Sequence, residues 1–350
     1  MPDVPASTFL DFADHEARGV SALYDRLARE VAARASLRNM LGAAPPNHRR
    51  ATLFFAAIHD VVLEQNGTYP ADGPALEAFC AANYGAIIAR IASRRTQTNE
   101  VARSAQLIPS LAAVSAMAEG TPTILEVGAS AGLNLRFDSY RYTYRILGQA
   151  VSVGDAASSV DIECSFEGHR RVIPSAIPTV GQRIGLDAEP VDLADAQQVR
   201  WLRACVWADE ADRAARLSAA VTLVRRDPPL VLRGDAIDNL DSAARHLPSD
   251  VPMVIVHQAL MAYLSTRDRV RFRHAVKALA RRRPVYWLFV ESPTAAGTLA
   301  DVAPPPDGRT QHVVVLADLT RAQRPAVVLA VADPHGRWLR WVASGSRKRD

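Results

Sequence analysis

Several features are scarce or absent in this sequence, and each narrows the class of protein that it can encode. The 350 residues include only three cysteines, Cys80, Cys164 and Cys205, which lie far apart and show no metal-ligand spacing. This pattern suggests neither a disulfide framework nor a zinc site, and it fits a reducing compartment. No run of 18 apolar residues occurs, so we expect no membrane-spanning helix.

The start of the chain is acidic where a secretory signal would be basic. It carries Asp3, Asp11, Asp14 and Glu16 and lacks the apolar segment of a signal peptide. We therefore expect a cytoplasmic protein.

Lysine is almost missing as well. The formal net charge is +4, yet Lys277 and Lys348 are the only lysines among 41 basic residues. The arginines are scattered as short pairs, whereas a nucleic-acid-binding surface would cluster charge on one face. We therefore expect neither a nucleic-acid nor a membrane partner, and a small molecule is the default substrate.

The rest of the composition is that of a globular protein. Hydrophobic residues make up 49% of the chain and charged residues 22%, which is enough for a large core. Apolar residues recur at helical spacing around residues 23–31, 53–62, 87–91 and 101–111. Thr98 or Asn99 can cap the last of these helices. We predict a helical N-terminal region at residues 1–120 and an α/β domain at residues 121–350.

Short apolar runs alternate with helical patterns from residue 123 onward. Runs at 124–127, 230–232, 253–256 and 285–290 are typical of parallel strands buried on both faces. Helical patterns at 195–206, 209–224 and 267–280 predict a twisted sheet with helices on both sides. Later runs at 314–316, 327–331 and 339–342 predict antiparallel strands that end the sheet. Residues 141–180 predict an insertion with one or two strands.

The segment 123–134, TILEVGASAGLN, predicts a buried strand and a glycine-rich turn that opens a helix. The N–H groups in the first turn of such a helix can hold an anion. The same letters allow a second chemistry, because Gly128-Ala129-Ser130-Ala131-Gly132 has the Gly-x-Ser-x-Gly form of a serine hydrolase nucleophile elbow.

Polar residues end several of the predicted strands, at the edge where open parallel sheets bind ligands. They are Glu126, Asp187, Asp235, His257 and Glu291. Carboxylates at adjacent strand ends can accept hydrogen bonds from the hydroxyls of a ribose and the amine of an adenine.

His257 is the candidate catalytic base, because an imidazole that titrates near neutrality can take a proton from an attacking atom. Glu291 either orients His257 or caps the next loop. A structural role, with His257 bonded to a neighbouring loop, remains the alternative. His335 belongs to an Asp-Pro-x-Gly turn whose form needs no ligand to explain it.

Two resemblances follow from these motifs. Residues 125–132 resemble the first motif of class I S-adenosylmethionine-dependent methyltransferases, and Arg233-Gly234-Asp235-Ala236 resembles their adenine-proximal turn. Most of the chain resembles a bacterial family, the domain of unknown function numbered 2332. The shared segments are Gln97-Thr98-Asn99-Glu100, Glu126 to Asn134, Trp207-Ala208-Asp209, Arg233-Gly234-Asp235, Val256-His257-Gln258 and Pro334-His335-Gly336-Arg337-Trp338.

These resemblances imply a Rossmann-like methyltransferase fold, preceded by helices, that binds S-adenosylmethionine. Glu126 would open the cofactor motif, and Asp187 would face the ribose. The residues implied for the methionine part are Gly128, Ala129, Ser130 and Gly132, and those implied for the adenine are Asp235 and Ala236. Asn134 would either donate to the cofactor carboxylate or satisfy the helix surface. Ser130 departs from the motif, since many methyltransferases have glycine there.

Three functions therefore stay open: a methyltransferase, a catalytically silent binding module of the same fold, and a serine hydrolase with Ser130 as nucleophile. The hydrolase fold needs several strands before its elbow, and residues 1–120 supply helices instead. A dinucleotide-binding oxidoreductase would require glycine at Ser130 and Leu133. The polar segment 95–100, including Gln97, Asn99 and Glu100, has more polar residues than a helix cap needs. One hypothesis is that it folds over the strand ends and closes the pocket, and the alternative is an ordinary polar helix start.

Overall fold

The chain forms two compact units, each built from two separate stretches of sequence. The structure is a computed structural model that describes residues 4–97, 99–297, 310–321 and 325–343. The first unit comprises Met1–Thr98 and Asp192–Ser218, and the second comprises Asn99–Val191 and Ala219–Asp350. Residues 99–120, which we placed with the helical region, thus belong with the sheet, and a later segment joins the helical unit.

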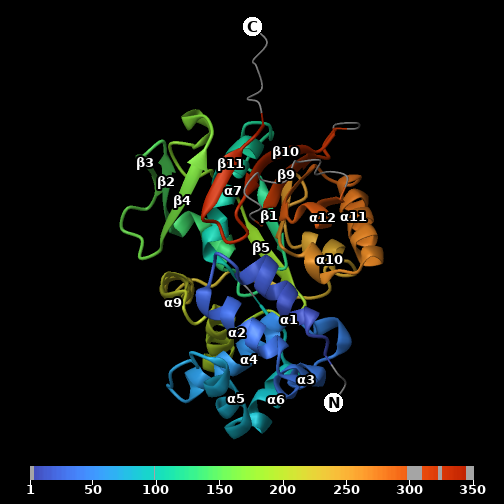
Figure 1. The fold of residues 1–350 in the computed structure, drawn as a ribbon. Coiled ribbons are helices and arrows are strands. Elements are labelled where there is room, and N and C mark those ends of the chain that lie inside the picture. The colour runs from blue at the N-terminus through green and yellow to red at the C-terminus, as the bar shows by residue number, and fades with distance from the viewer. Residues whose placement is uncertain (1–3, 98, 298–309, 322–324, 344–350) are drawn as a thin grey trace. The chain divides into compact units, whose positions relative to one another are not determined.

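The first unit is helical (Figure 1). Its α-helices are α1 (Ser7–Phe12), α2 (Ala22–Ala32), α3 (Ala35–Met40), α4 (Ala51–Glu64), α5 (Gly73–Ala82), α6 (Tyr84–Ser93), α8 (Ala196–Ala204) and the first part of α9 (Ala211–Val224). Its shorter turns are η1 (Ala13–Ala17), η2 (Leu41–Ala43) and η3 (Pro46–His48). No described residue before Thr123 lies in a strand, which confirms that the N-terminal part is helical.

Aromatic side chains from both stretches form the core of the first unit. Trp207 stacks on Tyr24 with ring centroids 5.2 Å apart and meets Phe12 edge-on at 5.5 Å. Phe54 and Phe55 of α4 lie in the same core. Each such pair adds about 0.5–1.5 kcal/mol beyond its burial, so residues 192–218 contribute directly to the stability of the N-terminal helices.

No single helix among the described residues is long and apolar enough to cross a membrane. The pair α5 and α6 meets the length and composition criteria only when taken together, and it is bent by 87°.

The second unit contains one sheet of 11 strands in the order β3-β2-β4-β11-β10-β9-β8-β7-β1-β5-β6. Their bounds are β1 (Thr123–Val127), β2 (Arg141–Ile146), β3 (Gln149–Gly154), β4 (Asp161–Glu167), β5 (Arg183–Asp187), β6 (Val231–Arg233), β7 (Met253–Gln258), β8 (Val285–Glu291), β9 (His312–Asp318), β10 (Val327–Ala332) and β11 (Trp338–Trp341). The neighbours from β6 to β8 are all parallel. The predicted mixed α/β class with a mostly parallel sheet is confirmed.

The predicted end of the sheet is wrong in one respect. Strands β8 to β11 pair antiparallel as expected, but β4 then pairs with β11 in parallel and carries β2 and β3 with it. The insertion at 141–180 therefore supplies three strands and extends the sheet beyond β11. Leu147 and Gly148 both have positive φ, 48° and 81°, which suits the tight hairpin between β2 and β3.

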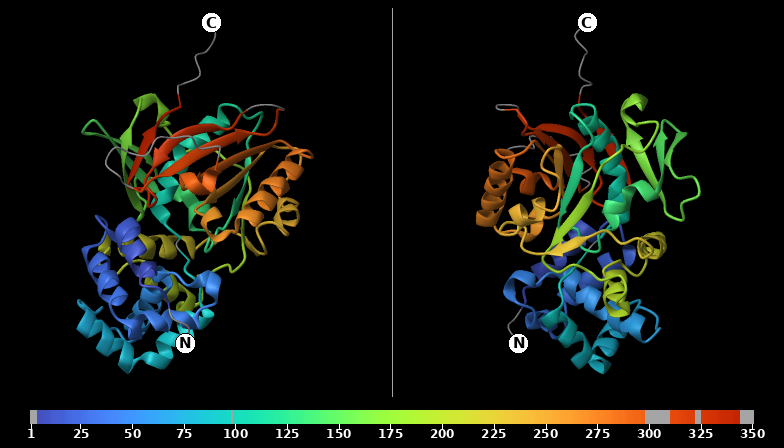
Figure 2. Two further views of the ribbon diagram at one scale, coloured as in Figure 1. Left: turned by 45° about the vertical axis from the view of Figure 1, so that its right-hand side comes forward. Right: turned by 180° about the vertical axis from the view of Figure 1, so that it is seen from behind.

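The two faces of the parallel region carry different helices (Figure 2). Successive residues of a strand point to opposite faces. Leu125 and Ile255 point to the face that carries α10 (Leu240–Ala244) and α11 (Thr266–Ala280). The short helix α12 (Pro293–Ala296) packs on the same face. Glu126 and Val256 face the other side, where α7 (Ser104–Ser115) lies.

The helix expected after the glycine-rich turn does not form as an α-helix. Residues Leu133–Ser139 form η5, a 3₁₀ segment interrupted by non-helical backbone at Arg136. Leu133, Asn134, Leu135 and Phe137 are all buried there. Burial on several sides favours this tight, kinked segment over a regular amphipathic helix. The remaining 3₁₀ turns are η4 (Val101–Arg103), η6 (Arg170–Val172) and η7 (Met261–Tyr263).

Candidate functional site

One edge of the sheet gathers most of the predicted site residues. The carboxyl ends of β1, β5, β6, β7 and β8 lie there because these strands are parallel. β10 ends at the same edge, since two antiparallel pairings separate it from β8. Residues of the 126–134 motif, the 256–258 motif and the 333–337 turn therefore share one edge.

The turn after β1 is compact because three of its residues adopt positive φ. The angles are 79° at Gly128, 53° at Ser130 and 70° at Gly132. A Cβ on Gly132 would lie 2.6 Å from Pro229 Cγ, so glycine is required there by packing as well as by conformation. A Cβ on Gly185 of β5 would lie 2.6 Å from Ala129 Cβ, and its absence lets the turn approach β5 closely.

Several N–H groups of this turn already have acceptors within the protein. Gly128 N donates to Leu186 O at 2.8 Å, and Leu133 N donates to Asn99 Oδ1 at 3.3 Å. Ser130 N donates to Asp187 Oδ2 at 2.7 Å. The turn is thus fixed from both sides, and these N–H groups are not aimed at an open anion site. Gly128 is exposed, whereas Ala129, Ser130 and Gly132 are buried.

Asp187 and Asp235 end neighbouring strands. Asp187 Oδ1 accepts a hydrogen bond from Glu189 N at 2.8 Å, so each of its oxygens has one donor. Asp235 is exposed, and its Oδ1 accepts from Ile237 N at 2.7 Å and Asp238 N at 3.0 Å, while Ala236 is half-buried. A carboxylate oxygen accepts more than one hydrogen bond, so both side chains retain capacity for a ligand.

Glu126 lies in a different environment from these two carboxylates. It is 4% exposed, and its Oε2 atom makes no hydrogen bond with any described residue. Burial raises the pKa of Glu126 to about 8, and the negative charge of Asp187 adds to the rise. Glu126 is therefore mainly protonated at neutral pH.

A small cavity lies beside Glu126 on the α7 face. It is lined by Asn134 and Glu126 and by the apolar side chains of Leu107, Leu111, Ile124, Leu135, Phe137 and Val256. Asn134 Nδ2 donates to Gln258 Oε1 at 3.2 Å and to Glu100 O at 3.4 Å, whereas its Oδ1 is buried without a partner among the described residues. The amide N–H groups of Asn134 thus serve internal acceptors, which favours the structural alternative for this residue.

His257 and Glu291 are adjacent, as the catalytic hypothesis requires. His257 Nδ1 and Glu291 Oε1 are 2.8 Å apart, and the side chains are 0% and 1% exposed. The imidazole stacks on Phe289 at 5.2 Å and meets Phe272 edge-on at 5.4 Å. Leu260 N and Met261 N also donate to Glu291 Oε1, at 2.8 and 3.0 Å.

The position of this pair favours the structural alternative. His257 pairs with Phe289 across β7 and β8, so it lies on the α11 face, opposite Glu126 and Asn134. An imidazole without exposure cannot meet a substrate from solvent. The hydrogen bonds to Glu291 instead fix the turn at 259–261, where Ala259 has a φ of 57°.

The segment after Thr98 covers the same edge. Glu100 Oε1 accepts from Ala102 N at 3.1 Å and so caps η4, in place of the predicted Asn99, which binds the glycine-rich turn. Thr98, the other predicted cap, lies outside the described residues, and Gln97 belongs to the first unit. Asn99 and Glu100 thus contact the segment that directly follows the glycine-rich turn, and closure of a pocket by residues 95–100 stays a prediction.

The turn at 333–337 holds this segment in place. Arg103 Nε donates to Pro334 O at 2.7 Å, and Gln106 Nε2 donates to Asp333 O at 2.6 Å. A Cβ on Gly336 would lie 2.3 Å from Ala102 O, so only glycine allows this approach.

Comparison with known families confirms the resemblance to a bacterial family that the sequence indicated. A family model described as "Uncharacterized protein conserved in bacteria (DUF2332)" matches residues 6–341. The chain belongs to this family. A search of curated proteins gave no match. The DUF2332 description assigns no activity, so the functional argument depends on the geometry of the site.

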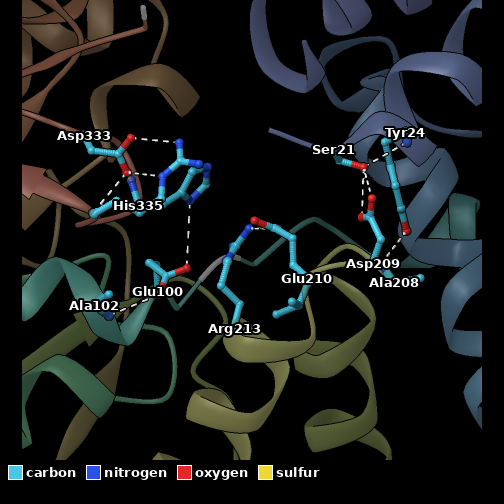
Figure 3. A network of polar contacts seen from close by, with 12 residues as sticks. Ser21, Tyr24, Glu100, Ala102, Ala208, Asp209, Glu210, Arg213, Asp333 and His335 are labelled. Atoms are coloured by element: carbon cyan, nitrogen blue, oxygen red, sulfur yellow. Dashed lines mark hydrogen bonds and ion pairs between the residues drawn. The ribbon is translucent and has the colours of Figure 1, made fainter. Parts of the chain in front are cut away.

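The DUF2332 segment Trp207-Ala208-Asp209 lies in the first unit and has a structural explanation (Figure 3). Ser21 Oγ donates to Asp209 at 2.6 Å, and Ala208 N donates to the Tyr24 hydroxyl at 3.2 Å. These contacts join the start of α2 to the segment before α9.

Sequence reasoning missed Arg103, Gln106 and Gln258 as members of the site. Arg103 and Gln106 are 8% and 0% exposed. Their position inside the apolar pattern at 101–111 could have indicated them, because a polar side chain that is buried there needs a hydrogen-bond partner. Gln258 follows His257 directly and points to the opposite face, where it meets Asn134.

Proposed function

We propose that this chain binds S-adenosylmethionine at the carboxyl ends of β1, β5 and β6 and transfers its methyl group to a small molecule. The observation that carries the proposal is the order of the parallel strands. Numbered along the chain, β1, β5, β6, β7 and β8 stand in the order 3-2-1-4-5 across the sheet. This is the order of doubly wound nucleotide-binding folds, whose ligands bind where the strand order reverses, here beside β1 and β7.

The positions of the polar residues support an adenosyl ligand. Asp187 is the last residue of β5, the second parallel strand, and Asp235 lies just after β6, the third. We assign the ribose hydroxyls to the remaining lone pairs of Asp187 and the adenine amine to Asp235, with Ala236 beside the ring. Gly128, the exposed residue of the turn, would contact the methionine part.

The hydrogen bonding of the turn favours this cofactor over a dinucleotide. A pyrophosphate needs free N–H groups at a helix N-terminus. Here Gly128, Ser130 and Leu133 donate to protein acceptors, and η5 replaces the α-helix. A thioether or sulfonium group needs only close contact, which such a turn still offers.

The serine hydrolase alternative lacks support from the geometry. Ser130 has the strained, positive φ of a nucleophile, but its hydroxyl is buried and has no hydrogen-bond partner among the described residues. A nucleophilic serine needs a histidine within hydrogen-bond reach. A catalytically silent binding module remains the alternative, and it differs from a methyltransferase in binding the cofactor without transferring its methyl group.

Calorimetric titration of the full chain with S-adenosylmethionine and S-adenosylhomocysteine tests the proposal. We expect binding by the wild type and a 10- to 100-fold weaker affinity for Asp187→Asn, since a hydrogen bond to a charged group contributes about 1.5–3 kcal/mol. Asp161→Asn is the matched control, because Asp161 is an exposed carboxylate on β4 that pairs with Arg141. Absence of binding at millimolar ligand by folded protein would falsify the cofactor assignment. Binding without methyl transfer to any acceptor would favour the silent module.

A further inference from the structure

A histidine and a glutamate from distant parts of the chain face each other (Figure 3). His335 Nδ1 lies 3.9 Å from Glu100 Oε2. The glutamate side chain is 4% exposed, whereas the histidine side chain is 23% exposed. One member of the pair is therefore buried and the other can reach a molecule in solvent.

Contacts on both sides fix this arrangement. Glu100 is held by the hydrogen bond from Ala102 N to its Oε1. On the other side, His335 N donates to Asp333 Oδ1 at 2.8 Å, which fixes the start of the turn. The close approach of Gly336 to Ala102 and the hydrogen bond from Arg103 to Pro334 then join the two segments. The pair is thus positioned before any ligand arrives.

The pair also lies next to the glycine-rich turn. Glu100 O accepts from Asn134 Nδ2, and the preceding residue, Asn99, accepts from Leu133 N. Leu133 directly follows Gly132 of the turn. Direct hydrogen bonds therefore connect the Glu100 segment to η5, which directly follows the turn that we assign to the cofactor.

We propose that His335 is a catalytic base for a hydroxyl-bearing methyl acceptor, and that Glu100 positions it. This inference rests on the proposed function. A buried carboxylate beside Nδ1 favours the tautomer in which Nε2 can accept a proton, and it stabilises the imidazolium that forms. We choose a hydroxyl acceptor because the neutral oxygen of an alcohol or phenol is a poor nucleophile until a base removes its proton, whereas a neutral amine attacks through its lone pair and can lose its proton afterwards.

The step balances without a further reactant. The acceptor oxygen forms a bond to the methyl carbon, while the carbon–sulfur bond breaks and leaves its electron pair on sulfur. The hydroxyl proton moves to His335 Nε2 and later to solvent. The products are a methyl ether, S-adenosylhomocysteine and one proton.

Charged groups of two chain segments lie near His335. Glu100 faces it from the segment before η4, and Asp333 and Arg337 lie in its own turn, where they pair with each other at 2.8 Å. Arg103 contacts the turn through Pro334 O. Of these groups, Glu100 is the one whose carboxylate oxygen, Oε2, faces His335 Nδ1.

The first test uses the chain without a cofactor. Diethyl pyrocarbonate modifies neutral histidine, so its reaction rate at His335, followed across pH by peptide mass spectrometry, reports the titration of this ring. We expect Glu100→Gln to shift this titration to lower pH, because the variant removes the carboxylate that favours the imidazolium. His169, an exposed histidine near β4, is the internal control and should titrate alike in both proteins. An unchanged His335 titration would overturn the positioning role of Glu100.

The second test separates the inference from the proposed function. S-adenosylmethionine affinity is measured by calorimetry, and methyl transfer is measured with methyl-labelled cofactor and a panel of catechols, phenols and aliphatic hydroxy acids. We expect His335→Asn to keep the affinity and the melting temperature of the wild type and to lose about 10²-fold or more in rate, with His169→Asn unchanged. His335→Gln is the second variant, in case the first fails to fold.

The outcomes distinguish the two claims. If the wild type binds no S-adenosylmethionine, the proposed function fails, while the His335 titration still decides whether Glu100 acts on His335. If the cofactor binds and His335→Asn transfers methyl groups at the wild-type rate, the inference is overturned. Cofactor binding with no transfer to any hydroxyl acceptor in the panel overturns the acceptor class.

Discussion

Glu126 shows at the scale of one residue how burial changes a role that the sequence suggested. The motif indicated an ionised carboxylate beside a cofactor. The structure places this side chain against an apolar cavity, where burial raises its pKa to about 8. The letters of a motif give the type of side chain, but its protonation depends on burial and on the charge of Asp187, which is distant in sequence.

The raised pKa of Glu126 predicts a pH dependence of stability. The folded state keeps a proton that the unfolded state loses near the ordinary glutamate pKa of 4.5. Between about pH 4.5 and pH 8 the folded state therefore binds more protons, so the free energy of unfolding falls as pH rises. The full effect is on the order of 5 kcal/mol. Above the folded pKa the contribution stays constant.

Glu126→Gln tests this prediction through urea unfolding at pH 5 and pH 8.5. The neutral amide cannot ionise, so we expect the variant to match the wild type at pH 5 and to be more stable at pH 8.5. Glu163→Gln is the control, because Glu163 is exposed on β4 and its ion pair with Arg145 contributes at most about 1 kcal/mol. Equal losses at both pH values would contradict a protonated Glu126.

At the scale of single elements, the turn after β1 shows which features follow from local sequence. The sequence predicted the strand, the turn and the need for small residues, all of which follow from local preferences. It did not predict η5, because that segment depends on burial by residues remote in sequence. It also did not predict that β4 joins β11, since alternating Tyr142, Tyr144 and Ile146 indicate a strand but not its partner.

Substitution of Gly132 tests the packing of this turn. Both Gly132→Ala and Gly148→Ala place a Cβ at positive φ, which costs about 1–2 kcal/mol. Only Gly132→Ala also drives the Cβ to 2.6 Å from Pro229, and overpacking adds roughly 1–3 kcal/mol. Urea unfolding should therefore show a larger loss for Gly132→Ala. Similar losses in the two variants would mean that Pro229 moves away freely.

At the scale of the whole molecule, the fold class and the helical N-terminal part were predictable, because they follow from hydrophobic periodicity. The assignment of residues 192–218 to the helical unit was not. Their helical pattern between β5 and β6 is the pattern of an ordinary crossover helix. Only tertiary contacts, such as those of Trp201 and Trp207 in the helical core, reveal where the segment belongs.

A buried carboxylate joins the two chain segments of the first unit and can be tested. Asp60 of α4 is 4% exposed and binds Arg90 Nε at 2.6 Å and Arg200 Nε at 3.0 Å. Removing its charge leaves two guanidinium groups without their buried partner, and breaking such a pair costs about 3–5 kcal/mol. We expect Asp60→Asn to lower the melting temperature of the helical unit, which circular dichroism measures.

Glu64→Gln is the matched control for Asp60→Asn. Glu64 binds the same two arginines, at 2.7 and 2.8 Å, but its side chain is 46% exposed. Water can replace its hydrogen bonds, so the loss should be about 1 kcal/mol or less. A loss as large as that of Asp60→Asn would show that burial does not decide the energetics of this cluster.

The split first unit has a consequence for how the chain is made. Residues up to 98 leave the ribosome well before residues 192–218, which complete their core. At about 5–20 residues per second, the helices wait several seconds with the apolar surface for Trp201 and Trp207 uncovered. Nascent chains stalled between residues 98 and 192 should therefore recruit chaperones that bind exposed apolar helices, and release them once the later segment emerges.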